Sequence, residues 1–265
     1  MGKTIGIIAI KGGVGKTTTV SNLGAVLASE FNKKVLLVDA NFSAPNLGLH
    51  LGIVDPAKTL HDVIENKATI HEAVQEHDHG FHIIPSSLVH KKINPFKLKN
   101  RLASIKKNYD VILVDSSPTL NEEILATMLA SDELYVVTSA DYPTLSCTMS
   151  AVKLAKERKT PISGLIINKT RGEKFELSLT EIEESTGIPV LAVIPDDIKV
   201  LEALSETKSA ALHAPKKDFA IEYKKLAGFL VGEEYKDKRL KTKVKDFFLT
   251  NHDVPKQNIN RILKE

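Results

Sequence analysis

The feature that most limits the fold of this chain is a series of short apolar runs that do not alternate with polar residues. They are rich in Val and Ile, which is typical of strands in a parallel sheet covered on both faces. Such runs occur at residues 4–10, 34–39, 81–85, 109–115, 133–139, 162–168 and 189–194. We therefore expect a buried, mostly parallel sheet.

Stretches with helical periodicity separate most of these runs. One face of the first stretch carries Val20, Leu23, Val26 and Leu27. Helices are expected at residues 17–31, 119–130, 146–158, 177–186 and 218–231. Strands alternating with helices indicate right-handed βαβ units, so we predict an α/β fold with a doubly wound sheet and helices on both faces. Ligands of such sheets bind at the carboxyl ends of the strands.

The positive charge of the chain is concentrated at its C-terminal end. The 265 residues carry a formal net charge of +3, and residues 233–265 hold nine Lys/Arg against six Asp/Glu. Residues 1–232 are therefore neutral, which argues against a broad surface for nucleic acid. We predict a domain over residues 1–232 and a basic, amphipathic helical tail over residues 233–265.

The tail combines lysines with apolar side chains at helical spacing. One face of its first part carries Leu240, Val244, Phe247 and Phe248. A membrane surface, a partner protein, the chain's own domain and DNA all stay open as contacts. DNA is the least favoured, because the whole chain has only five arginines.

Cysteine usage and hydropathy limit the compartment. A single cysteine, Cys147, allows neither an internal disulfide nor a cysteine cluster for metal. No run approaches the roughly 20 apolar residues that span a bilayer, and the first run leads into glycines rather than a signal-peptide cleavage site. We expect a cytoplasmic protein, with peripheral membrane contact through the tail left open.

A glycine-rich loop joins the first apolar run to the first helix. In the stretch KGGVGKT, Gly12, Gly13 and Gly15 let backbone N–H groups turn toward phosphate oxygens, and the following helix adds its dipole. Lys16 is expected to reach the β- and γ-phosphates, and the Thr17 hydroxyl to bind Mg²⁺. The loop is an altered form of G-x-x-x-x-G-K-[ST], because the first glycine of that pattern is missing.

The order KGGVGKT, with Lys11 in front, resembles the deviant Walker A loop of the MinD/ParA family of ATPases, and MinD-like members most closely. The resemblance covers most of the chain before the tail and implies a P-loop NTPase fold with ATP and Mg²⁺ as cofactors. In that family the first lysine reaches the partner's phosphates across a dimer interface, much as an arginine finger does. The expected nucleotide-binding residues of the loop are Gly12, Gly13, Val14, Gly15, Lys16, Thr17 and Thr18.

Two acidic strand ends complete the expected metal site. Asp39 ends an apolar run, where it would act through a water on Mg²⁺ or on the nucleophile. Asp115 ends a run that resembles the Walker B strand, and a carboxylate there would hold the water shell of Mg²⁺. The expected metal residues are thus Thr17, Asp39 and Asp115. The alternative is that the two acids are only turn or helix-capping residues.

Asn41 departs from the family pattern, which usually has a second Asp two residues after the first. That Asp is linked to activating the attacking water, whereas an amide orients a water but takes up no proton. Slow hydrolysis, or catalysis by Asp39 alone, therefore stays open. The expected catalytic residues are Lys11, Lys16, Asp39 and Asn41.

Later segments resemble the parts of the family that hold the nucleoside. Asp141 matches by position an acid that reaches the ribose of the partner's nucleotide, and the alternative is a solvated loop acid. Asn168 ends GLIINK at the family's place for an amide that reads adenine. Pro195 and Asp196 resemble the loop over the other side of the base.

The resemblance implies an ATP hydrolase that works as a dimerising switch. ATP and Mg²⁺ would join two subunits face to face, and hydrolysis would separate them. The output would be spatial positioning, in cell division or of another structure, with an activator or adaptor protein as partner. The alternatives are a ParA-like DNA partition ATPase and an ATP-binding switch with very slow hydrolysis.

Overall fold

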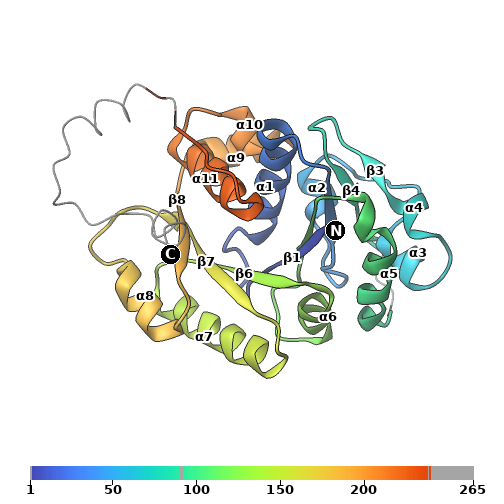
Figure 1. The fold of residues 1–265 in the computed structure, drawn as a ribbon, viewed down its shortest axis with the longest axis horizontal. Helices are drawn as coiled ribbons and strands as arrows, with labels where there is room; N and C mark the ends of the chain where they lie inside the picture. Colours follow the sequence, from blue (N-terminus) through green and yellow to red (C-terminus); the bar gives the residue numbers. More distant parts are fainter. Residues whose placement is uncertain (1, 90–91, 238, 240–265) are drawn as a thin grey trace.

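The computed structural model describes residues 2–89, 92–237 and 239. Its centre is an eight-stranded sheet in the order β3-β4-β2-β5-β1-β6-β7-β8 (Figure 1). Every neighbouring pair is parallel except β3 with β4. The strands are β1 (Lys3–Ile8), β2 (Val35–Asp39), β3 (Gln75–Glu76), β4 (His82–Ile84), β5 (Val111–Asp115), β6 (Glu133–Thr138), β7 (Ile162–Thr170) and β8 (Val190–Pro195).

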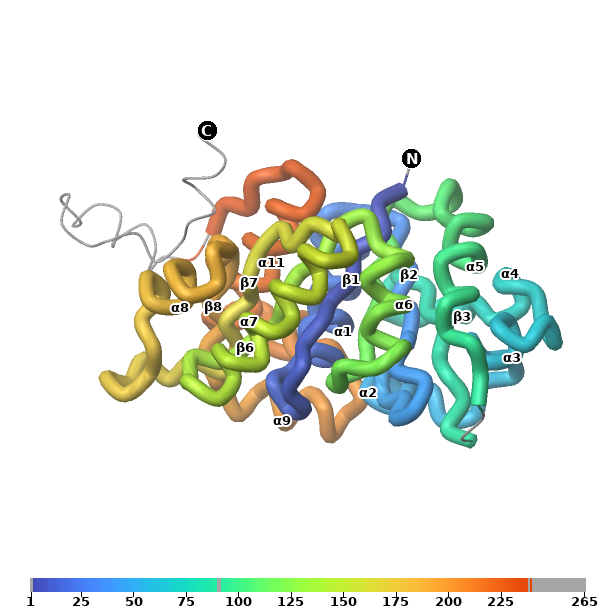
Figure 2. The backbone as a smooth tube through the Cα atoms, turned by 90° about the horizontal axis from the view of Figure 1, so that it is seen from below, coloured from blue at the N-terminus to red at the C-terminus, as the bar shows by residue number. Residues whose placement is uncertain are grey.

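Helices cover both faces of the sheet, as predicted. Figure 1 shows α1, α10 and α11 together on one side and α6, α7 and α8 on the other, and Figure 2 shows α8, α7, α6 and α5 next to one another across the second face. The helices are α1 (Lys16–Phe31), α2 (Leu47–His50), α3 (Leu60–Ile64), α4 (Ile70–Ala73), α5 (Leu98–Ile105), α6 (Glu122–Ala130), α7 (Tyr142–Glu157), α8 (Leu179–Thr186), α9 (Ile198–Ser205), α10 (Ala210–His213) and α11 (Asp218–Val231), with 3-10 turns η1 (Pro95–Lys97) and η2 (Lys106–Asn108).

Successive strand residues contribute to cores on opposite faces. Ile7 packs in the core that includes α1 and α11, whereas Ile8 packs in the core that includes α6 and α7. In β2, Leu37 belongs to the first of these cores and Val38 to a third core with α3, α4 and α5. Because both faces are buried, the strands need no polar positions, which explains the unbroken apolar runs.

Two helices begin three or four residues away from their predicted starts, whereas α1 and α8 differ by only one and two residues. α7 begins at Tyr142, before the expected start at residue 146, because Asp141 caps it and Pro143 occupies its first turn. α6 begins at Glu122, after the expected start at residue 119, because the Asn121 side chain accepts from its first N–H groups. The sequence patterns also missed β3 and the short helices α2–α5, α9 and α10.

The chain turns back after α11. The Glu233 N–H donates to the Gly228 carbonyl at 2.8 Å, and a Cβ on Gly228 would lie only 2.3 Å from the Glu233 oxygen. Further along, the Arg239 guanidinium donates to Asp218, the first residue of α11, at 2.6 Å. The segment after α11 therefore runs back along the helix, from its last turn to its start.

Most of the predicted tail, including its amphipathic face at Leu240, Val244, Phe247 and Phe248, lies outside the described residues. Within the part of the chain that is described, no helix combines the length and apolar character needed to cross a membrane.

Gly24 offers a test of how closely α1 lies on the sheet. A Cβ at this position would lie 2.6 Å from Leu37 Cδ2, and Leu37 is fully buried. Ala is the better helix former by about 1 kcal/mol, but overpacking costs about 1–3 kcal/mol. We expect Gly24→Ala to lower the free energy of unfolding in urea. Ser29→Ala, on the exposed side of the same helix, is the control; a stabilising Gly24→Ala would contradict the close approach.

Candidate functional site

The glycine loop lies between β1 and α1, at the carboxyl edge of the sheet. Gly13 and Gly15 have φ values of 78° and 91°, a left-handed backbone that favours glycine. A Cβ on Gly15 would also lie 2.1 Å from Asn168 Nδ2 at the end of β7. The end of β7 thus approaches the loop after β1 so closely that only glycine fits at position 15. Gly12 and Gly13, at the front of the loop, are exposed to solvent.

Lys16 and Thr17, the first residues of α1, converge on Asp115 at the end of β5. Lys16 Nζ donates to Asp115 Oδ1 at 2.6 Å, and Thr17 Oγ1 lies 2.7 Å from Asp115 Oδ2 and 2.9 Å from Asn46 Oδ1. Lys16 is 6% exposed, Thr17 7% and Asp115 0%. The lysine therefore compensates a carboxylate that has no access to water.

Asp39 stands beside Asp115 as its register partner at the end of β2. The N–H groups of Asn41, Asn46 and Leu47 donate to its carboxylate at 3.2, 3.1 and 3.0 Å. Even so, burial and the adjacent negative charge of Asp115 raise the pKa of Asp39 to about 7. Two buried carboxylates side by side favour a proton or a cation between them.

Asn41 has an oxygen without a partner. The residue is 3% exposed, and its Nδ2 donates to the Ala44 carbonyl. Its Oδ1 accepts no hydrogen bond from any residue that the structure describes. An unsatisfied buried acceptor costs about 1–3 kcal/mol. Asn41 also lines the nucleotide-sized pocket described below, so a ligand or a water is the candidate partner for this oxygen.

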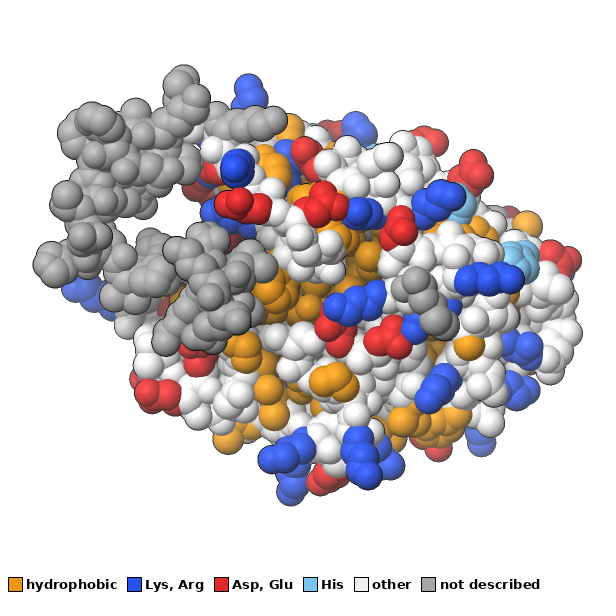
Figure 3. Space-filling view, viewed as in Figure 1, with side chains coloured by type: hydrophobic (Ala, Val, Ile, Leu, Met, Phe, Trp, Pro, Cys, Tyr) orange, Lys and Arg blue, Asp and Glu red, His pale blue; other side chains and the backbone are white. Residues whose placement is uncertain are grey.

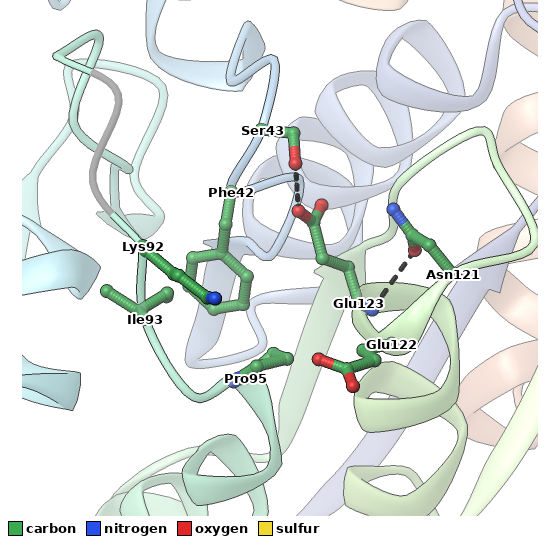
Figure 4. Close-up of a pocket in the computed structure, with 8 residues that line it drawn as sticks. All are labelled: Phe42, Ser43, Lys92, Ile93, Pro95, Asn121, Glu122 and Glu123. Carbon is green, nitrogen blue, oxygen red and sulfur yellow. Dashed lines mark hydrogen bonds between the residues drawn. The ribbon is translucent and has the colours of Figure 1, made fainter.

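The segment that follows Asn41 is fixed on its far side by α6. Ser43 donates to Glu123, and Phe42 stands at a small cavity lined by Lys92 and Pro95 (Figure 4). This cavity has a volume of about 220 Å³, below the 300–1,000 Å³ usual for ligand sites. The segment thus lies between the large pocket and α6: Asn41 lines the pocket, and Ser43 is bonded to α6.

A pocket of about 510 Å³ opens over the glycine loop, a size suited to a small molecule. Asp115 lies just beneath its lining, in contact with Thr17 and Lys16, and Asp39 stands beside Asp115. The predicted residues that line it are Lys11, Gly12, Gly13, Val14, Gly15, Lys16, Thr17, Thr18, Asn41, Asn168, Pro195 and Asp196. Of the fifteen predicted site residues, twelve therefore line this pocket, and Asp115 lies directly beneath Lys16 and Thr17 with Asp39 beside it.

Asn168 is held against the loop in this structure. Its Nδ2 donates to the Val14 carbonyl at 2.8 Å, and the adjacent Lys169 Nζ donates to the Gly13 carbonyl at 2.8 Å. Arg171, the first residue after β7, donates to Asp196 at 3.2 Å. The end of β7 and the residues after β8 therefore form one connected wall of the pocket.

Asp141, like Asp39 and Asp115, is a predicted site residue outside the lining of the pocket. It caps α7, and its carboxylate accepts from Lys11 Nζ at 3.3 Å, while Lys11 also donates to Thr144 Oγ1 at 2.7 Å. Burial alone would raise the pKa of Asp141, but hydrogen bonds from Ser139, Thr144 and Lys11 outweigh it and lower the pKa to about 2. Lys11 is thus bound to an acid of its own chain here.

Several pocket residues were not predicted. Lys169 directly follows the predicted residue Asn168, and this adjacency is the one sequence signal that could have identified it as a pocket residue. Val200, Leu201 and Leu204 lie on α9, a helix absent from the predicted elements. The full set of these residues is Asn46, His50, Pro118, Lys169, Arg171, Ile194, Asp197, Val200, Leu201, Leu204 and Tyr223.

Comparison with known proteins agrees with this geometry. Residues 2–162 match the family described as an AAA domain. An uncharacterized ATP-binding protein of Methanocaldococcus jannaschii is 31% identical over 93% of this chain and 94% of its own length. The septum site-determining protein MinD of Pyrococcus horikoshii, solved with Mg-ADP, is 32% identical with a TM-score of 0.82, covering 87% of this chain and 96% of that one. The chain belongs to the MinD/ParA family of P-loop ATPases.

The MinC:MinD cell division protein complex of Aquifex aeolicus contains a further relative. That MinD is 25% identical with a TM-score of 0.80, and the match covers 89% of this chain and 99% of that one. The predicted family and the predicted P-loop NTPase fold are both confirmed.

The residues at the loop fit this family's cofactors on their own chemistry. The hydroxyl of Thr17 and the carboxylates of Asp39 and Asp115 are the hard oxygen donors that Mg²⁺ prefers. A divalent cation would also remove the repulsion between the two buried acids. The glycine loop and the N-terminus of α1 supply N–H groups suited to phosphate.

Asp39→Asn tests the charge balance in the nucleotide-free chain. The pKa of Asp39 rises from its ordinary value of 3.8 to about 7 on folding. The folded state therefore holds an extra proton between these values, and Asp39 lowers stability as pH rises through that window. We expect Asp39→Asn to raise the free energy of unfolding in urea at pH 8 by about 1–3 kcal/mol, and by much less at pH 4.

Asp55→Asn, at an exposed position, is the matched control and should change stability little at either pH. If Asp39→Asn instead destabilises the chain equally at both pH values, the two carboxylates are not in electrostatic conflict.

Proposed function

We propose that this chain is an ATP-dependent switch. It binds ATP with Mg²⁺, joins a second copy face to face, and separates after hydrolysis, with spatial positioning of a cellular structure as its output. The observation that carries the proposal is the convergence of Lys16 and Thr17 on Asp115, beside Asp39, beneath a pocket of nucleotide size. We also propose that the chain works in the cytoplasm.

In this proposal each wall of the pocket has one task. The loop amides and Lys16 hold the phosphates, and Lys16 exchanges its contact with Asp115 for the β- and γ-phosphates. Thr17, Asp115 and Asp39 hold Mg²⁺ and its waters, which neutralise the charge that develops in phosphoryl transfer. Asn168, Pro195 and Asp196 enclose the base.

The surface around the pocket supports face-to-face association. Leu120 is 53% exposed, Tyr142 70%, Ile198 70% and Leu201 62%. These residues follow β5, β6 and β8, so they lie at the carboxyl edge of the sheet, as the pocket does. Exposed apolar groups at the rim of a polar site indicate a surface that another protein covers.

Lys11 is proposed to serve the nucleotide of the partner subunit. Its side chain is 41% exposed, and its contacts with Asp141 and Thr144 are of a kind that water and salt weaken. In the dimer it exchanges them for phosphate oxygens across the interface. Asp141, freed by this exchange, is then available to the ribose of the same nucleotide.

We expect wild-type protein mixed with ATP and Mg²⁺ to have the mass of a dimer in light scattering. Lys11→Ala should still bind ATP but stay monomeric, because its partner's phosphates lose a cation. Lys16→Ala should lose ATP binding itself, and Lys99→Ala, an exposed lysine on α5, should dimerise like wild type. If the wild-type protein stays monomeric when saturated with ATP, the role proposed for Lys11 is wrong.

Hydrolysis is proposed to be slow, because Asn41 orients the attacking water without accepting its proton. We expect Asn41→Asp to release phosphate about tenfold faster or more, since a positioned base contributes 10²–10⁴-fold. Steady-state phosphate release measures this, with Asn108→Asp as an exposed control. Equal rates for wild type and Asn41→Asp would leave Asn41 no part in limiting turnover.

A protein partner is proposed as activator or adaptor, by analogy with the MinD solved in complex with MinC. DNA is a weaker candidate. Residues 1–232 are neutral, and on the face in Figure 3 the Lys and Arg side chains are interspersed with Asp and Glu. The contact of the tail, with membrane as one candidate, is separate from this proposal.

A further inference from the structure

A groove of about 900 Å³ lies between α8 and α11. Leu177 and Leu179 at the start of α8 form one wall, and Val193 of β8 contributes to the floor. β8 is the last strand in the sheet order, so no described strand covers its outer edge. The apolar part of the groove is therefore open on the side where the sheet ends.

The chain itself leads into this groove. The segment after α11 runs back along the helix. Its last described residue, Arg239, lines the groove. Its guanidinium donates to Asp218 at 2.6 Å, to Asp237 at 2.9 Å and to the Lys216 carbonyl at 3.0 Å. Arg239 is therefore held at the groove, and 26 residues follow it in the sequence.

The next residues match the groove in chemistry. The charged residues around its apolar floor are five acids and three cations, so the rim is negative on balance, although Asp218, Asp237 and Glu222 already pair with cations of the rim. The acids are Glu173, Glu176, Asp218, Glu222 and Asp237, and the cations are Arg171, Lys225 and Arg239. The segment 240–248 pairs an apolar face with three lysines, namely Lys241, Lys243 and Lys245. An apolar helix face flanked by lysines suits an apolar floor with an acidic rim.

We propose that residues 240–248 dock as a helix in this groove of their own chain, with Leu240, Val244, Phe247 and Phe248 facing its floor. Arg171 and Pro195 line both this groove and the nucleotide pocket, so the docked segment lies next to the wall of the nucleotide site. The docking needs neither nucleotide nor dimer and is independent of the proposed function.

A single tryptophan tests the docking, because the chain has none. We use full-length Phe247→Trp, dilute and without nucleotide or lipid. Docking predicts blue-shifted emission and weak quenching by acrylamide. Adding Leu179→Lys puts a like charge in the groove and should shift the emission to the red and increase quenching severalfold. Adding Leu129→Lys, at an exposed leucine on α6, should change neither.

The proposal would be overturned if Phe247→Trp alone shows the emission of a solvent-exposed tryptophan, or if its blue-shifted emission is unchanged by Leu179→Lys. So would a blue shift that appears only at high protein concentration, which means docking on a second copy. A shift only with phosphatidylglycerol vesicles means a membrane contact instead. If Leu179→Lys fails to fold, Leu179→Cys and Phe247→Cys in a Cys147→Ser chain should form an intramolecular disulfide, and Leu129→Cys with Phe247→Cys should not.

Discussion

The charge balance at the ends of β2 and β5 governs the site. Asp39 and Asp115 are both buried, and Lys16 is the only cation within hydrogen-bonding distance of them in the described chain. The parallel sheet forces this arrangement, because equal register brings the two strand ends together. The backbone N–H groups after β2 and the first turn of α1 are arranged around the remaining negative charge, which a divalent cation would balance.

Most of the sheet and much of the site follow from local patterns. Val- and Ile-rich runs identify buried parallel strands, and ends of parallel strands meet at one edge, so Asp39, Asp115 and Asn168 were predictable as residues of the same edge of the sheet. The start of α7 was missed because Asp141 acts as a cap, which periodicity does not reveal. The contact between Lys11 and Thr144 joins residues 133 positions apart, and only tertiary structure brings them together.

Asn41 illustrates the limit of reading a residue by its type. The sequence indicates a lost base, since an amide takes up no proton. The structure adds that its buried oxygen has no partner among the described residues and lies at the pocket. The residue therefore retains an unpartnered acceptor in the lining of the pocket. An aspartate at this position would differ from it in proton affinity.

The short segment after β2 connects two surfaces of the molecule. Asn41 faces the pocket, and Ser43, two residues later, is bonded to Glu123 on α6. The lining of the pocket and α6 thus belong to one continuous path of covalent and hydrogen bonds that is only a few residues long. A displacement of Asn41 would have to be absorbed within two residues or passed on to Glu123.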